Sequence, residues 1–193
     1  KSNGGVMGIE PFIIPTAEQE VQWIKDRVAQ FRWFEEPIGA GWAYGANRDY
    51  MQALQKHWLH DFNWSEWVEK LNQYPHFRAD VDDEVALHFI HKKSRRSDAI
   101  PLLISHGWPG SVLEFMHIID DLCDPEDESL PAFHVVAPSL PGYAWSDKPK
   151  RPFGPRAIGR YYDRLMGDIL GYENYLAQGG DWGCLISAWI GLD

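Results

Sequence analysis

From residue 100 onward, short apolar segments alternate with helical patterns, and this alternation narrows the folds that the chain can adopt. Apolar strands are predicted at 100–105, 133–137 and 175–178, and helices at 112–122, at about 155–170 and from residue 182 to the end. Two earlier strands are predicted at 77–81 and 85–89, which makes five. Because strand–helix alternation is typical of parallel βαβ units, we expect an α/β fold with a mostly parallel sheet and helices on both faces.

The residues before these strands have helical periodicity. Thr16-Ala17-Glu18-Gln19 has the spacing of a capping box, and apolar residues follow it on one helix face. Further helices are predicted near 49–61 and from about 63 to Pro75. We therefore predict two parts, a helical N-terminal segment at 1–76 and a part of an α/β core at 77–193.

Composition and charge exclude several classes of partner. The 193 residues carry a formal net charge of −10, which argues against nucleic acid and anionic membranes. No apolar run reaches the ~18–20 residues of a membrane span, and residues 1–5 lack the apolar stretch of a secretory signal. Cys123 and Cys184 have no metal-type spacing, and we expect free thiols in a reducing compartment. The sequence thus predicts a soluble cytoplasmic protein without a metal or cofactor.

The loop after the strand at 175–178 has the pattern of a reactive turn. A side chain on a sharp strand-to-helix turn needs small residues two positions before and after it. Gly179 and Gly183 meet this need around Asp181, with Gly180 and Trp182 between them. The pattern matches the nucleophile elbow Gly-x-Ser-x-Gly with Asp at the centre. A plain surface turn rich in Gly and Asp is the structural alternative.

The loop after the strand at 100–105 is predicted to face this elbow. In α/β sheets, ligands bind beyond the carboxyl ends of the strands. In the α/β-hydrolase plan, this loop and the residue after the nucleophile supply the two oxyanion-hole donors. Those donors would be the backbone N–H groups of Trp108 and Trp182. We expect the helix that follows to open with a capping box at Ser111-Val112-Leu113-Glu114.

Other residues of these loops are assigned to substrate binding or to shaping the site. The side chains of Trp108, Pro109 and Trp182 are predicted to contact substrate. We expect His106 to hydrogen-bond the loop in place and not to act as a base. The residues expected to be structural at the site are His106, Gly107, Gly179, Gly180 and Gly183. The loop at 138–146 is predicted to be either a wall beside the site or a structural connection.

Three motifs in order resemble those of α/β-hydrolase-fold epoxide hydrolases of the microsomal type. They are His106-Gly107-Trp108-Pro109-Gly110-Ser111, Ser139-Leu140-Pro141-Gly142-Tyr143 and Gln178-Gly179-Gly180-Asp181-Trp182-Gly183. The leader, with Asp61-Phe62-Asn63-Trp64 and Tyr74-Pro75-His76-Phe77, is similar to the segment that wraps the core in that group.

The resemblance implies that Asp181 is the nucleophile. It also implies an acid, a His and two cap tyrosines that follow the elbow helix. We therefore expect the N-terminal half of an enzyme, without the later strands and the cap domain. Downstream sequence or a second chain would complete it.

The identity of the nucleophile selects the reaction. An Asp is ionised near neutral pH, and the start of a helix favours its charge by ~0.3–1 kcal/mol. A carboxylate opens an sp3 carbon by displacement and forms an ester, which water then hydrolyses. Epoxides and alkyl halides both suit this chemistry, so a haloalkane dehalogenase is an alternative. The leader and the loop at 108–110 favour an epoxide hydrolase that converts a small apolar epoxide and water to a vicinal diol.

The resemblance carries further expectations about this hydrolase. It implies a role in detoxification or in aromatic hydrocarbon catabolism, and it implies that the isolated half is inactive. A non-catalytic binding module, or a structural half docked on a partner polypeptide, is the alternative from another class. The sequence leaves a homo-oligomer open.

Overall fold

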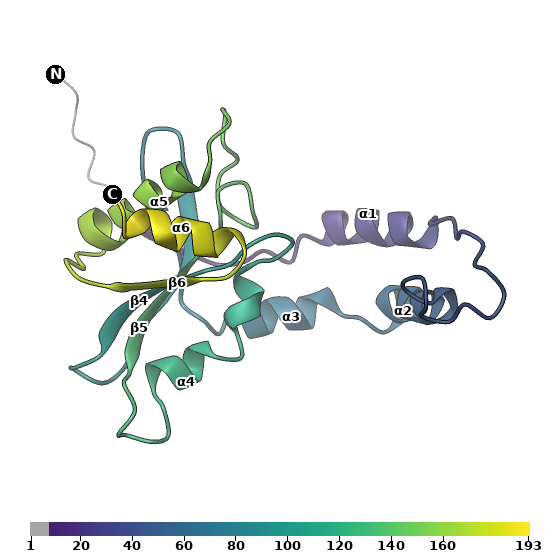
Figure 1. Cartoon of the computed structure of the whole chain (residues 1–193), viewed down its shortest axis with the longest axis horizontal. Helices are drawn as coiled ribbons and strands as arrows, with labels where there is room; N and C mark the ends of the chain where they lie inside the picture. The colour runs from purple at the N-terminus through teal and green to yellow at the C-terminus, as the bar shows by residue number, and fades with distance from the viewer. Residues whose placement is uncertain (1–7) are drawn as a thin grey trace. The chain divides into compact units, whose positions relative to one another are not determined.

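A six-stranded sheet in the order β1-β2-β3-β5-β4-β6 carries the larger part of the chain (Figure 1). The computed structural model describes residues 8–193. The five predicted strands are present, and a short additional strand precedes them. The strands are β1 (Ile9–Phe12), β2 (His76–Asp80), β3 (Ala86–Lys92), β4 (Ile100–Ser105), β5 (Phe133–Pro138) and β6 (Leu176–Gly179).

The sheet is mixed, which differs from the expectation of a mostly parallel sheet. β1 pairs antiparallel with β2, β2 with β3, and β3 with β5. Only β4 pairs in parallel, with β5 on one side and β6 on the other. The β2–β3 connection is a tight turn in which Asp82 Oδ1 accepts the N–H groups of Glu84 and Val85 at 2.8 and 2.7 Å. A turn this short can join only antiparallel neighbours.

Helices cover both faces of the sheet, as predicted. The helices of the sheet-bearing part are η1 (Val112–Phe115), α4 (Ile119–Cys123), α5 (Pro155–Arg164), η2 (Leu165–Ile169) and α6 (Trp182–Ile190). Leu103 of β4 packs in one apolar cluster with α5, η2 and α6. Its neighbours Leu102 and Ile104 pack in a second cluster with η1 and α4. Since successive strand residues point to opposite faces, β4 is buried on both sides.

Two of the predicted helices are interrupted. The helix expected at 112–122 is split into η1 and α4, and between them the carbonyl of Met116 accepts the hydroxyl of Tyr74 at 2.9 Å. Its predicted capping box does form at Ser111 and Glu114. The helix expected at 155–170 ends in a π-turn, in which Leu170 N–H donates to the Leu165 carbonyl five residues earlier.

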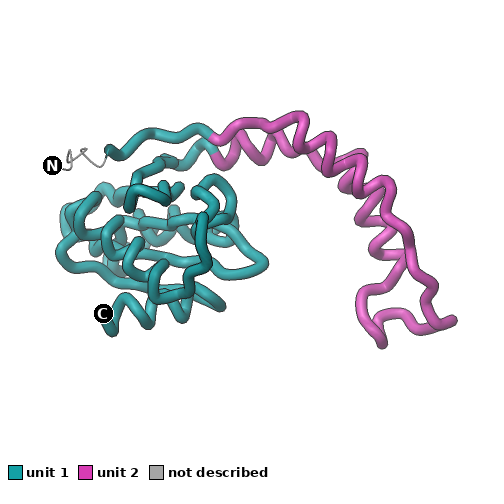
Figure 2. Tube along the Cα trace, turned by 90° about the horizontal axis from the view of Figure 1, so that it is seen from above, with its two compact units in different colours: residues 1–13, 72–193 teal, residues 14–71 magenta. Residues whose placement is uncertain are grey.

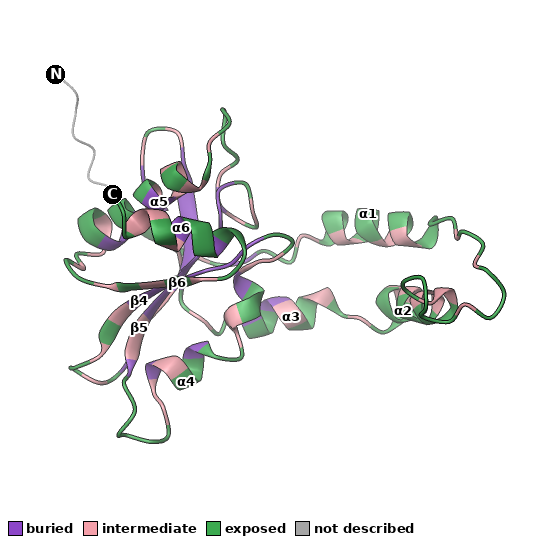
Figure 3. Cartoon of the chain, viewed as in Figure 1, coloured by how far each residue is buried: buried purple, intermediate pink, exposed green. Residues whose placement is uncertain are grey.

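Residues 14–71 form a separate compact unit of three helices, and the described residues up to 13 belong with 72–193 (Figure 2). The three helices are α1 (Glu18–Ala29), α2 (Arg48–His60) and α3 (Trp64–Leu71). The capping box predicted from Thr16 does not form, because Ala17 is the N-cap with φ 51° and no side chain caps the helix. Buried residues concentrate in the sheet and its flanking helices (Figure 3). No helix of residues 8–193 is long and apolar enough to cross a membrane.

Candidate active site

Asp181 lies at a sharp turn between β6 and α6. Its backbone has φ 53° and ψ −124°, a region that residues with a side chain rarely adopt. Strained conformations of this kind persist where the surrounding structure holds them, and they are frequent at functional sites. The turn reverses the chain between strand and helix and presents the Asp181 side chain at the carboxyl end of the sheet.

Two glycines around Asp181 are required by contact. A Cβ on Gly179 would overlap the backbone of Gly183, and a Cβ on Gly183 would overlap the carbonyl of Ser105 in β4. A Cβ on Gly180 would meet no atom within 4 Å. All three glycines are predicted to be structural, and the geometry gives a steric reason for Gly179 and Gly183 only.

The register of the parallel strands brings the two predicted loops together. Ser105, the last residue of β4, lies beside Gly179, the last residue of β6. The backbone N–H of Trp108 then donates to Asp181 Oδ1 at 2.9 Å, although the two residues are 73 positions apart. A Cβ on Gly107 would overlap the Asp181 side chain, so the close approach of the loops needs glycine there. The peptide bond between Trp108 and Pro109 is cis.

Backbone hydrogen bonds favour the ionised form of Asp181. The N–H groups of Trp108 and Trp182, in that order of effect, hold the pKa of the Asp181 carboxyl below its ordinary value. The side chain is exposed. The carboxylate is therefore charged at neutral pH and open to a ligand, as a nucleophile must be.

The indoles flanking the carboxylate are also open to solvent. Trp108 is 66% exposed and Trp182 is 46% exposed, and Pro109 is exposed as well. Large apolar side chains at such exposure present a surface that an apolar ligand can cover. The predicted substrate contacts thus lie around Asp181 without enclosing it.

His106 is buried beneath the loop. Its Nδ1 lies 3.0 Å from the Gly107 carbonyl oxygen, and its Nε2 accepts the N–H of Leu140 at 3.1 Å. Burial lowers the pKa of the ring, which keeps it neutral. Both ring nitrogens are engaged with backbone groups, so His106 is placed to hold the loop.

A chain of buried polar side chains, which the sequence does not predict, anchors the loop at 138–146. The Nδ1 of His88 lies 2.9 Å from the Ser139 hydroxyl, and its Nε2 lies 2.9 Å from His76 Nδ1. The Ser146 hydroxyl donates to the Ser139 carbonyl at 2.7 Å. Burial is the largest cause that lowers the pKa of His88, to about 3. In the sequence, His88 lies between the alternating apolar residues Leu87 and Phe89, on the opposite face of the predicted strand, so the alternation does not mark it as buried.

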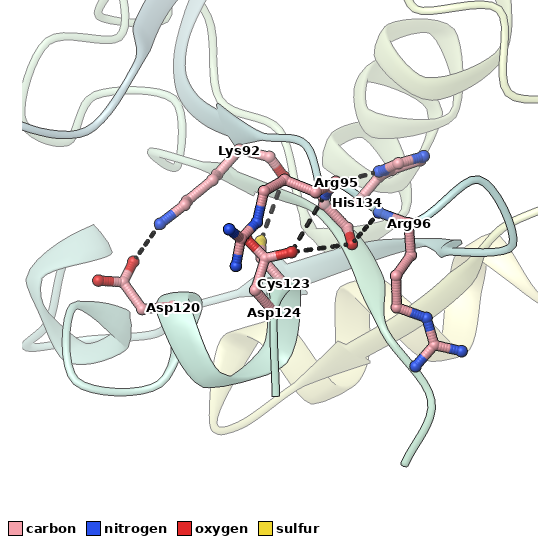
Figure 4. A network of polar contacts seen from close by, with 8 residues as sticks. Lys92, Arg95, Arg96, Asp120, Cys123, Asp124 and His134 are labelled. Atoms are coloured by element: carbon pink, nitrogen blue, oxygen red, sulfur yellow. Dashed lines mark hydrogen bonds and ion pairs between the residues drawn. The ribbon is translucent and has the colours of Figure 1, made fainter. Parts of the chain in front are cut away.

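A second polar cluster holds the basic loop that follows β3 (Figure 4). Lys92 pairs with Asp120, and Asp124 accepts the backbone N–H of Arg95 and pairs with its side chain. The backbone N–H of Arg95 is the largest cause of the lowered pKa of Asp124. Within residues 8–193, no group of three or more His, Cys, Asp or Glu side chains is placed to hold a metal ion. These charges tie loops together, and they lie in a different cluster from Asp181.

Comparisons with known proteins agree with this geometry. The family profile described as "Epoxide hydrolase N terminus" matches residues 9–115, and that of the alpha/beta hydrolase fold matches residues 100–193. A putative epoxide hydrolase of Stigmatella aurantiaca is 37% identical over 180 residues, which are 91% of this chain and 40% of that protein. Epoxide hydrolase 1 of Sus scrofa is 37% identical over 186 residues, 92% of this chain and 40% of that protein.

Solved structures give the same result. Juvenile hormone epoxide hydrolase from the silkworm Bombyx mori aligns with a TM-score of 0.85 and 36% identity over 96% of this chain and 44% of its own. Aspergillus niger epoxide hydrolase aligns with a TM-score of 0.82 and 30% identity over 96% of this chain and 49% of its own. The chain thus spans less than half the length of these relatives. With an Asp-centred elbow, a matching fold and a family profile over residues 9–115, the chain belongs to the epoxide hydrolase family of the α/β-hydrolase fold.

Proposed function

We propose that this chain carries the nucleophile and the oxyanion hole of an epoxide hydrolase that forms an ester intermediate on Asp181. One observation carries the proposal: the N–H of Trp108 meets Asp181 Oδ1 at 2.9 Å on an elbow with a positive φ. An ionised carboxylate that is exposed and held by backbone donors suits attack on an sp3 carbon.

In the first step, the carboxylate opens the epoxide. Because Oδ1 accepts the Trp108 N–H, we infer that Oδ2 is the oxygen that attacks. A bond forms between Oδ2 and one ring carbon as the bond from that carbon to the ring oxygen breaks. The ring oxygen leaves as an alkoxide and takes a proton from an acid. The family resemblance assigns this acid to two cap tyrosines outside the 193 residues.

In the second step, water attacks the carbonyl carbon of the ester. The negative charge develops on Oδ1, which accepts the Trp108 N–H, and the Trp182 N–H also hydrogen-bonds this carboxyl group. Losing one such donor typically costs ~3–4 kcal/mol of transition-state stabilisation. The tetrahedral intermediate then releases the vicinal diol and returns Asp181 to its ionised form. The base for this step is the downstream His that the resemblance implies.

The remaining parts of the proposal concern substrate and setting. Exposed Trp108, Pro109 and Trp182 support a small apolar epoxide as substrate, with water as the second reactant. We propose that the rest of the same enzyme, or a second chain, supplies the base and the cap. We also propose a cytoplasmic location and a role in detoxification or aromatic hydrocarbon catabolism.

The proposal is tested by the mass of the protein after incubation with styrene oxide. Cys184 is an exposed free thiol three residues from Asp181 and would itself react with an epoxide, so the measurement uses a Cys184→Ser background. We expect a stable adduct of one styrene oxide, because ester hydrolysis stalls without the downstream base. Asp181→Asn in the same background should form no adduct, because an amide is a poor nucleophile.

Two outcomes would count against the proposal. Equal labelling of the Cys184→Ser protein and its Asp181→Asn variant would remove Asp181 from the nucleophile role. An Asp181-dependent adduct with an alkyl bromide but none with styrene oxide would favour the haloalkane dehalogenase alternative.

A further inference from the structure

The N–H that meets Asp181 belongs to a peptide group that is held at both ends. Gly107 C=O and Trp108 N–H are parts of one planar unit, and the cis bond follows Trp108, so this unit is trans. In a trans peptide the C=O and the N–H point in opposite directions. The C=O end lies 3.0 Å from His106 Nδ1, and the N–H end lies 2.9 Å from Asp181 Oδ1.

Gly107 makes this peptide group easy to rotate. A side chain at residue 107 would overlap Asp181, so the contact between the loops requires glycine. Glycine also has the widest choice of backbone angles. A rotated peptide would place the Gly107 carbonyl, an acceptor, opposite the carboxylate. A stable oxyanion hole therefore needs a second contact that prevents the peptide group between Gly107 and Trp108 from rotating.

His106 has the bonding to provide that constraint. The Leu140 N–H can only donate, so Nε2 of His106 must accept. In the neutral ring the proton then resides on Nδ1, which donates to the Gly107 carbonyl. The ring is 1% exposed and packs edge-on against Tyr143 at a centroid distance of 5.4 Å.

The anchor on the other side of the ring is itself rigid. Leu140 is 3% exposed, and its neighbour Ser139 is fixed by His88 and by Ser146. The Leu140 N–H therefore selects the tautomer of His106 from a fixed position. The contacts run without interruption from the buried chain at His88 to the oxygen of Asp181.

We propose that His106 is a positioning residue for the oxyanion hole. It holds the Gly107 carbonyl away from the site, so that the Trp108 N–H stays directed at Asp181 Oδ1. His106 neither touches the reacting atoms nor transfers a proton in this role. The catalytic consequence rests on the proposed function, whereas the orientation of the peptide can be measured without any reaction.

Two substitutions test the two hydrogen bonds of the His106 ring one at a time. In His106→Asn the side-chain amide reaches the position of Nδ1 and can donate to the Gly107 carbonyl. In His106→Gln the amide reaches the position of Nε2 and can serve Leu140 only. We expect the pKa of Asp181, followed by carboxyl ¹³C NMR, to stay low in His106→Asn. In His106→Gln it should rise toward the ordinary value, because the Trp108 N–H is no longer fixed on the carboxylate.

The matched control is His88→Gln. His88 is as buried as His106 and also supports the 138–146 loop, but it makes no hydrogen bond to the peptide between residues 107 and 108. Its substitution should leave the pKa of Asp181 unchanged, because Ser139 keeps its backbone hydrogen bond to the residue 88 carbonyl at 2.8 Å and its bond from the Ser146 hydroxyl. An equal rise in His88→Gln and His106→Gln would show general loosening of the loop and would overturn the proposal, as would no rise in His106→Gln.

A measurement on the unsubstituted protein keeps the proposal testable if a variant fails to fold. The ¹⁵N spectrum of the His106 ring should show a neutral ring protonated at Nδ1 at pH 7. A ring protonated at Nε2, or a charged ring, would contradict the proposal.

The steady-state kinetics of His106→Gln provide the last test. In the enzyme that turns over, His106→Gln should lower kcat about tenfold to a hundredfold with little change in KM, since a missing hole donor costs about 10²–10³ in kcat. If Asp181 formed no ester at all, the proposed function would fail and the two NMR results would still stand or fall separately. A change confined to KM would contradict the positioning role.

Discussion

Gly183→Ala should disrupt the elbow and destabilise the protein, whereas Gly180→Ala should leave its stability almost unchanged. The new Cβ at residue 183 would overlap the Ser105 carbonyl, which lies at the end of buried strand β4 and cannot move aside without distorting the sheet. Overpacking typically costs 1–3 kcal/mol and occasionally more, and a clash with backbone belongs at the upper end, at about 3 kcal/mol or above. Because α6 would be pushed off β4, Asp181 should also lose its contact with the Trp108 N–H.

Urea denaturation measures this difference directly. Gly180 faces open space, so Gly180→Ala should stay within about 0.5 kcal/mol of the unsubstituted protein. In the Cys184→Ser background, adduct formation with styrene oxide should persist in Gly180→Ala and be lost in Gly183→Ala. Similar denaturation midpoints for the two variants would show that α6 does not pack on β4 as closely as described.

The protein should lose stability steeply as the pH falls below 6.5. The pKa of His88 is lowered to about 3, chiefly by burial, with His76 and Arg78 adding to the effect. Below pH 6.5 the unfolded chain binds a proton at this residue and the folded chain does not. The free energy of unfolding should therefore fall by about 1.4 kcal/mol per pH unit from this residue alone, from below pH 6.5 down toward pH 3.

His91 adds to the same slope. Its pKa is lowered to about 4, mainly by burial, and its ring contacts the Tyr172 hydroxyl at 2.9 Å. Because its side chain is partly accessible, its contribution to the pH dependence should be smaller.

Urea titrations at pH 7, 6 and 5 measure the combined effect of His88 and His91 on the free energy of unfolding. His88→Gln should flatten the slope by about 1.4 kcal/mol per pH unit. A pH-independent midpoint between 7 and 5 would show that His88 is protonated in the folded state.

The sharp turn at Asp181 could be predicted because its requirements are local. Gly179 and Gly183 lie two residues before and two residues after Asp181, and this spacing of small residues indicates a sharp turn. The strand–helix alternation after residue 100 predicts the sheet and the helices on both faces, because this pattern is also local in the sequence. Each signal depends on neighbours in the sequence.

The features missed depend on distant partners. β1 contains Pro11 and is a four-residue edge strand, so little in its composition identifies it before β2 is in place. The direction of strand pairing depends on which strands become neighbours, and β3 pairs with β5 and not with β4. The contact of His88 with Ser139 spans 51 positions and arises only from the register of the sheet.

The position of the covalent label tests the central claim, that Asp181 is the nucleophile, most directly. The Cys184→Ser protein is incubated with styrene oxide and digested, and the modified peptide is sequenced by tandem mass spectrometry; the substitution removes the exposed thiol that would itself react. We expect one styrene oxide on the carboxyl group of Asp181, in a linkage that mild alkali releases because it is an ester. A label found only on a histidine or on another side chain, and stable to alkali, would show that Asp181 is not the nucleophile.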